Sequence, residues 1–290
     1  MHIQCPPLHA PSNWPHRTSS LLRRTPLYKS PTGKRFLQNK IWNCTLLAQY
    51  ADDCAFVGLD VDGVANATAT QIGLVYLPQL PSTTPIPEDL IRGQRPPDLM
   101  RNFGAEVWCL NLDPPEEAGR TETPKTRRRR RCVWATQVLN LRAAAVEAQI
   151  CELLSKWKAQ SGKKYLVLVG FNMPVEFEAM ATLFPAAATT GLLDGWTDAQ
   201  DLARDTKRYI GEEAVRQHMQ KEPVKPWFPA LATMAANLGI TGIPSPKHNA
   251  ATDAIMAVAV MIAAWNAYEQ GMILDIPLPR SQRGQSADGK

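Results

Sequence analysis

Short apolar runs separated by polar loops dominate the first half of the central region. The first run covers residues 54–59 (CAFVGL), and two more cover 71–77 (QIGLVYL) and 106–112 (EVWCLNL). Runs of this length that are rich in β-branched and aromatic residues are typical of buried strands. Because no helical pattern separates the three runs, we predict that they form an antiparallel meander.

From residue 143 onward the pattern alternates between helical and extended spacing. Residues 143–158 repeat apolar side chains at helical spacing, and residues 165–169 (YLVLV) form a strand that ends at Gly170. Four more elements follow: a helix from Pro174 to about Phe184, a short strand at 192–197, a helix at 230–238 and an almost fully apolar helix at 249–269. The sequence therefore predicts an α/β fold with a mixed five-stranded central sheet flanked by helices.

The two ends of the chain have a different composition. Residues 1–45 are rich in Pro, Ser, Arg and Lys and contain no acidic residue, and the end of the chain, 277–290, is also polar. Such segments bury too little apolar surface to fold, so we predict two unstructured tails. Residues 50–272, between these tails, suit one domain in a chain of 290 residues.

Charge is distributed unevenly around a net value of +5. Besides the basic N-terminal segment, one loop carries a run of five arginines, namely Arg127, Arg128, Arg129, Arg130 and Arg131. Basic segments attract polyphosphates, so we expect nucleic acid as the partner, with this run as a binding element. A solvated loop and a nuclear localisation signal are the alternatives for the same run. The sequence identifies no protein partner.

Cysteine usage and hydropathy limit the other classes of function. None of the six cysteines forms a C-x-x-C pair, which disfavours a zinc site of the usual spacing. Several lie in apolar runs, as expected for reduced thiols of an intracellular protein in the nucleus or cytoplasm, with the mitochondrion as an alternative. The longest apolar run, Ala254–Trp265, is shorter than the roughly 20 residues of a membrane crossing, so we expect no membrane partner.

The first candidate site residues are Asp60 and Asp62, two positions apart at the end of the first predicted strand. Residues i and i+2 of a strand face the same way, so their carboxylates are expected side by side. Two such carboxylates repel each other unless a cation lies between them, and Mg²⁺ and Mn²⁺ prefer oxygen ligands of this kind. The alternative is a solvated Asp-Val-Asp-Gly turn.

Further acidic candidates follow later apolar elements. Glu176 is placed in the first turn of a predicted helix, where the helix dipole alone favours a carboxylate, and Glu178 competes for the same role. His248 and Asp253 flank the start of the last helix. A carboxylate at the mouth of an apolar helix needs a partner or a metal, because an unpaired buried charge is unfavourable.

These segments together resemble a known nuclease family. The motifs are VGLDVD (57–62) followed by QIGL (71–74), LVGFNMPVE (168–176), DAQDLA (198–203), ALATMAANLGI (230–240) and HNAATDA (248–254). In order and spacing they resemble the DEDDh (DnaQ-like) 3′–5′ exonucleases of the RNase H-like superfamily, and within it a fungal branch, the Gfd-type proteins, named for DEAD-box protein activity. The resemblance covers roughly residues 54–268.

The resemblance implies an RNase H-like fold and phosphodiester hydrolysis on single-stranded RNA or DNA. It implies that Asp60, Asp62, Glu176 and Asp253 bind two Mg²⁺ or Mn²⁺ ions, and that His248 is the general base. The chain departs from the family pattern at three positions: Asp62 stands for a Glu, Glu176 for an Asp, and Phe171 for a His.

Two other interpretations stay open at this point. The three departures also fit an RNase H-like scaffold that binds nucleic acid or an mRNA-processing or export partner without cutting. The segment Leu59-Asp-Val-Asp-Gly-Val64 is also similar to the strand end of haloacid-dehalogenase-type phosphatases, where the first Asp is the nucleophile. That family needs a Ser or Thr after a later strand, and Gly170-Phe-Asn offers no hydroxyl group.

Overall fold

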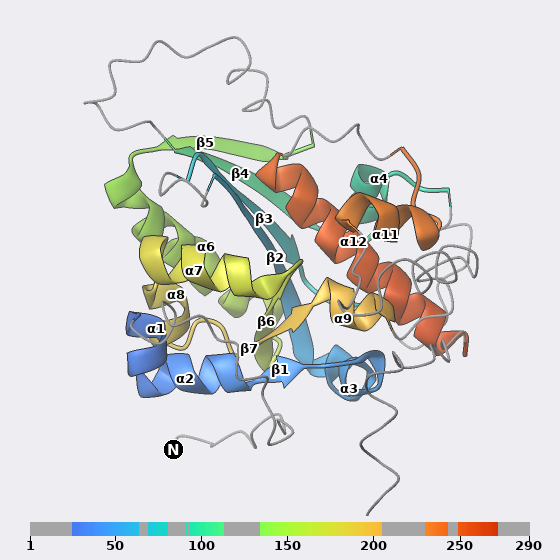
Figure 1. Cartoon of the computed structure of the whole chain (residues 1–290), viewed down its shortest axis with the longest axis horizontal. Coiled ribbons are helices and arrows are strands. Elements are labelled where there is room, and N and C mark those ends of the chain that lie inside the picture. Colours follow the sequence, from blue (N-terminus) through green and yellow to red (C-terminus); the bar gives the residue numbers. More distant parts are fainter. Residues whose placement is uncertain are drawn as a thin grey trace, which may run out of the picture.

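The central element of the protein is a seven-stranded mixed β-sheet with helices on both faces (Figure 1). The structure is a computed structural model and describes residues 25–63, 69–80, 91, 93–112, 134–204, 230–242 and 249–271. The strands are β1 (Lys40–Ile41), β2 (Cys54–Asp62), β3 (Gln71–Leu77), β4 (Glu106–Leu112), β5 (Gln137–Leu141), β6 (Tyr165–Gly170) and β7 (Gly195–Asp198). The α/β fold class is thus as expected, whereas the prediction of five strands is wrong.

Helices precede, separate and follow the strands along the described parts of the chain. They are α1 (Pro26–Lys29), α2 (Pro31–Gln38), α3 (Cys44–Tyr50), α4 (Pro96–Asn102), α6 (Val146–Ser161), α7 (Met173–Leu183), α8 (Ala186–Thr189), α9 (Ala199–Arg204), α11 (Leu231–Asn237) and α12 (Ala250–Glu269). Local sequence fixes several of their ends. Pro31 occupies the first turn of α2 behind the cap residue Ser30, the side chain of Asn249 accepts the N–H of Thr252 at the start of α12, and α6 ends at the left-handed Gly162.

The sheet has the strand order β1-β7-β6-β2-β3-β4-β5. β2, β3 and β4 are antiparallel neighbours, which confirms the predicted meander. All other neighbouring strands run parallel. In the register of β2 and β3, Asp60 pairs with Gly73 and Asp62 with Gln71. The end of β2 therefore lies beside the beginning of β3.

Two hydrophobic cores lie on opposite faces of the sheet. On β2, Phe56 belongs to the core that α3, α4, α9, α11 and α12 cover, and Val57 belongs to the core under α1, α2, α6, α7 and α8. This alternation is the strand periodicity of two. Both groups of helices are visible on their respective sides of the sheet in Figure 1.

Helix α12 is the central helix of the first core. By length and composition it could cross a membrane, with a mean hydropathy of 1.5 over its best window, but 94% of that window is buried inside the protein. Glycines let it approach the sheet closely. A Cβ atom on Gly73 would lie 2.1 Å from the carbonyl oxygen of Ala250, and one on Gly58 would lie 3.1 Å from that of Ala254.

The segment from residue 25 to residue 50 belongs to the folded domain. The side chains of Leu27 and Phe36 are buried, and β1 pairs in parallel with β7 at the edge of the sheet. The indole N–H of Trp196 donates to the carbonyl of Leu37 at 3.0 Å. The prediction of an unstructured tail over 1–45 is therefore wrong for residues 25–45, because these few apolar side chains find their partners far away in the sequence. Residues 1–24 and 277–290 lie outside the described residues.

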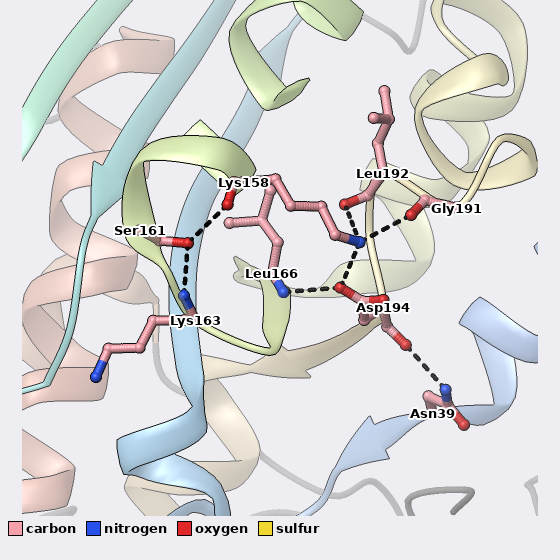
Figure 2. A network of polar contacts seen from close by, with 8 residues as sticks. All are labelled: Asn39, Lys158, Ser161, Lys163, Leu166, Gly191, Leu192 and Asp194. Carbon is pink, nitrogen blue, oxygen red and sulfur yellow. Dashed lines mark hydrogen bonds and ion pairs between the residues drawn. The ribbon is translucent and has the colours of Figure 1, made fainter. Parts of the chain in front are cut away.

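A polar network joins α6 to the connection between β6 and β7 (Figure 2). The ammonium of Lys158 donates to a carboxylate oxygen of Asp194 and to the carbonyl of Gly191, both at 2.9 Å. The same carboxylate oxygen accepts the backbone N–H of Leu166 at 2.9 Å, and the side-chain amide of Asn39 donates to the backbone carbonyl of Asp194. The network thus ties α6, β6 and the N-terminal segment to one carboxylate residue.

The described cysteines differ in whether they form a disulfide bond. Cys44, Cys54 and Cys151 are free thiols, as expected. Cys109, which is buried in β4, is disulfide-bonded. The expectation of reduced thiols is therefore wrong at Cys109, because an apolar sequence context suits a buried thiol and a buried disulfide equally.

Candidate functional site

The carboxyl ends of β2 and β6 and the first turns of α7 and α12 surround one pocket of about 320 Å³. Asp60, Asp62, Glu176 and Asp253 all line it. The other lining residues are Val61, Phe171, Asn172, Val175, Gln200 and Ala230. The four acidic residues come from positions as far apart as 60 and 253, and the fold brings them to one place.

The pair on β2 is placed by the strand itself. Asp60 and Asp62 follow Gly58 on the face that packs against α12, and each is partly exposed. Gly58 lies against the backbone of Ala254, so the next residue on that face, Asp60, lies near the start of α12. The sequence prediction that both carboxylates face one site is consistent with this geometry.

Glu176 reaches the pocket from the first turn of α7. Only 4% of the residue is exposed, and its Oε2 atom has no hydrogen-bond partner among the described residues. The backbone N–H of Val61 donates to its carboxylate. The pairing of β2 with β6 ends at Gly58 and Val169, so β6 does not occupy the N–H of Val61. Glu178, the competing candidate, does not line the pocket.

Asp253 lies in the first turn of α12, whose start is held by side chains of the sheet. The side-chain carbonyl of Gln71 accepts the backbone N–H of Ala250 at 3.0 Å. The amide nitrogen of Gln71 donates to Asn111 at 2.8 Å, and Asn111 donates in turn to Asn140 at 3.1 Å. A chain of amides across β3, β4 and β5 therefore fixes the helix end that carries Asp253.

Burial and the repulsion between neighbouring carboxylates raise the pKa values of two acids in the pocket, Asp60 and Glu176. Burial raises the pKa of Asp60 well above its usual value, and the charges of Asp253 and Asp62 raise it further. Burial also raises the pKa of Glu176, and the neighbouring charge of Asp60 adds to the effect. Carboxyl groups that resist ionisation because they share a small space are a feature of sites that receive a proton or a cation.

The potential ligand atoms of the pocket are of the chemical type that a hard divalent cation prefers. They are carboxylate oxygens, and one of them, Oε2 of Glu176, is buried without a partner among the described residues. As placed, however, the side chains of the described residues include no group of three or more His, Cys, Asp or Glu that could hold a metal ion. The pocket therefore brings suitable ligand residues together, but their side chains are not arranged in a metal-coordination geometry.

Some predicted site residues lie outside the described residues. These are His248 and the five arginines Arg127 to Arg131. The structure also adds residues that the sequence alone did not assign to the site. Among them are Gln71, which holds α12, and Asp198, which accepts backbone N–H groups next to the pocket. The signal that the sequence offered for Asp198 was its place at the start of the DAQDLA motif.

Comparison of the sequence with family models and curated proteins provides no relative. No family model matches the chain, and a search of curated proteins finds no similar sequence.

Proposed function

We propose that this protein is a metal-dependent nuclease that hydrolyses phosphodiester bonds in single-stranded RNA or DNA, with an RNase H-like fold and 3′–5′ exonuclease action. The observation that carries the proposal is the convergence of Asp60, Asp62, Glu176 and Asp253 on one pocket at the carboxyl end of the parallel strands. The motif resemblance supports the finer assignment. The sheet has seven strands, whereas we expected five for such a fold.

In this proposal the four carboxylates hold two Mg²⁺ or Mn²⁺ ions. When bound, the ions supply an activated water and stabilise the leaving oxygen. Both Asp253 and Asp62 raise the pKa of Asp60, which places the three carboxylates close enough to interact, and Asp60 would be one of the ligands. His248 is the proposed acceptor of the proton from the attacking water. The arginines Arg127 to Arg131 are proposed to hold the phosphate backbone.

The two acids that differ from the family pattern, Asp62 and Glu176, fit this proposal together. Asp62 is shorter by one methylene than the Glu of the family pattern, and Glu176 is longer by one than the Asp. Glu176 emerges beside Gly170, where a Cβ atom would lie 3.5 Å from its Cγ. That distance is an ordinary van der Waals contact, and the close approach at Gly170 is instead to Sδ of Met173, at 2.5 Å, so Glu176 fits beside position 170 without strain. Phe171 and Val175 supply an apolar wall of the same pocket.

The experiment uses the purified full chain, freed of metal, with 5′-labelled single-stranded RNA and DNA and added Mn²⁺ or Mg²⁺. We expect products that shorten from the 3′ end. Asp60→Asn and Asp253→Asn are expected to lose activity by about 100-fold or more, because each removes a proposed ligand. Asp194→Asn is the matched control, since Asp194 belongs to the network of Figure 2 and does not line the pocket.

The outcomes separate the alternatives. Cleavage by the wild type and Asp194→Asn but not by the two ligand variants supports the nuclease. Equal cleavage by all four proteins identifies a contaminating nuclease and contradicts the proposal. Absence of cleavage by the wild type with either metal also overturns it.

A non-catalytic scaffold is the second candidate function. It is favoured by the finding that the described side chains include no ready group of three or more metal ligands. A scaffold of this kind binds labelled single-stranded RNA or DNA with equal affinity in the presence of Mn²⁺ and of a chelator. The proposed nuclease instead binds more tightly with the cation, which a filter-binding titration measures.

A further inference from the structure

The carboxylate of Asp198 lies at the end of β7, where it faces the turn between β6 and α7. Its Oδ2 atom accepts the backbone N–H of Met173 at 3.0 Å. Its Oδ1 atom accepts the N–H of Asn172 at 3.3 Å and that of Gln200 at 3.0 Å. Only 6% of Asp198 is exposed. One buried carboxylate thus binds three backbone groups from two separate elements.

The turn that Asp198 holds has an unfavourable backbone conformation. Asn172 has φ 60° and ψ 52°, and it is the one non-glycine residue with positive φ among the described residues. L-residues other than Asn, Asp and Gly rarely adopt this left-handed conformation. The side chain of Asn172 does not cap α7. The carboxylate of Asp198 instead occupies the place of a helix cap and also favours the helix dipole.

This turn determines where Glu176 lies. α7 begins at Met173, whose N–H is bonded to Asp198, and Glu176 follows within the first helical turn. Asn172 and Gln200, whose N–H groups bind Oδ1, both line the pocket. Asp198 itself does not line the pocket. Asp198 therefore contacts the backbone around the pocket and occupies none of the pocket itself.

We propose that Asp198 is a positioning residue of the candidate nuclease site: it fixes the left-handed turn at Asn172 and so aims Glu176 at the metal-binding position. The role rests on the proposed function. Residues that orient metal ligands commonly influence metal affinity by about 10- to 100-fold. Asp198 binds backbone groups, which distinguishes it from the four acids that line the pocket, and its charge also raises the pKa of Glu176.

The test measures Mn²⁺ binding to the full chain by isothermal titration calorimetry. Asp198→Asn keeps the size of the side chain, but its NH₂ group must face one of the three N–H donors. We expect Mn²⁺ affinity to fall by about 10-fold or more. In the cleavage assay, kcat is expected to fall at saturating Mn²⁺ while KM for the nucleic acid stays close to the wild-type value.

Asp194→Asn is the control for a general loss of stability. Asp194 is another partly buried acid, on the connection from β6 to β7, and it also accepts a backbone N–H, that of Leu166. This variant is expected to lower the Tm and leave Mn²⁺ affinity unchanged. Equal Mn²⁺ affinity of Asp198→Asn and the wild type overturns the positioning role alone. Absence of Mn²⁺ binding by the wild type overturns the role together with the proposed function.

A second pair of variants tests the turn without changing any charge, and remains informative where Asp198→Asn fails to fold. Asn172→Gly and Asn172→Ala both remove the amide side chain, but only glycine adopts φ 60° freely. We expect Asn172→Ala to bind Mn²⁺ up to roughly 10-fold more weakly than Asn172→Gly, because alanine disfavours the left-handed conformation. Equal affinities of the two variants contradict the role of the turn.

Discussion

The contact between Gly73 and the start of α12 leads to a sharp prediction for Gly73→Ala. A Cβ atom at this position would lie 2.1 Å from the carbonyl oxygen and 2.3 Å from the carbonyl carbon of Ala250, and 2.5 Å from the nitrogen of Ala251. All three atoms belong to the backbone, so no side-chain rotation relieves the clash. To restore an ordinary contact of 3.4 Å to the oxygen, α12 and β3 must separate by about 1.3 Å.

That separation affects stability in two ways. Forcing a methyl group into a packed interface generally destabilises a protein by about 1–3 kcal/mol. The shift also weakens the 3.0 Å hydrogen bond from the N–H of Ala250 to Gln71, and a buried unsatisfied group adds about 1–3 kcal/mol. We therefore expect Gly73→Ala to lower the free energy of unfolding by about 3 kcal/mol, which corresponds to a Tm lower by roughly 6–12 °C.

Urea and thermal unfolding of the full chain provide the measurement. The matched control is Gly162→Ala at the end of α6, where φ is 60° and a Cβ atom would meet nothing within 4 Å. That variant has only the backbone penalty of a left-handed alanine, about 1 kcal/mol. If Gly73→Ala is no more destabilising than Gly162→Ala, the close approach of α12 to the sheet is refuted.

Three more perturbations have defined outcomes. Gln71→Leu leaves the N–H of Ala250 without its acceptor, so we expect the free energy of unfolding in urea to fall by about 2 kcal/mol. Lys158→Met leaves the partly buried Asp194 without its cation and is expected to destabilise by about 2 kcal/mol with unchanged Mn²⁺ binding. Burial raises the pKa of Asp198 from 3.8 to about 6, so the native state keeps a proton that the unfolded chain loses between these values. Metal-free stability should therefore fall as pH rises from about 4 to about 6, by up to about 3 kcal/mol, and Asp198→Asn should lack this part of the slope.

The interior strands were predictable from sequence because each is an apolar run. β2, β3, β4 and β6 are buried along most of their length, and their patterns in the sequence are correspondingly strong. β5 is an edge strand whose residues are mostly exposed, and β1 has only two residues. β1 is too short to carry a pattern, and in β5 only Leu139 and Leu141 pack against the core. Both depend on a neighbouring strand, which the local sequence does not contain.

The convergence of the four acids on one pocket could be predicted, whereas the residues that support them could not. Asp60, Asp62 and Glu176 come at the end of an apolar strand or just after one, Asp253 lies in the first turn of an apolar helix, and all four line one pocket. Asp198 acts on backbone N–H groups, which every non-proline residue possesses, so its partners leave no trace in the sequence.

The pairing of β1 with β7 also has a consequence for the order of folding during synthesis. The side-chain amide of Asn39 binds the carbonyl of Asp194, which lies 155 residues later in the chain. At about 5–20 residues per second, a ribosome needs roughly 8–30 s to make the intervening segment. During that time β1 has no strand to pair with, so α1, α2 and β1 are expected to stay undocked until β7 has been made. Protease treatment of ribosome-stalled chains tests this order: cleavage near Phe36 should persist in chains stalled before β7 emerges and should cease in longer ones.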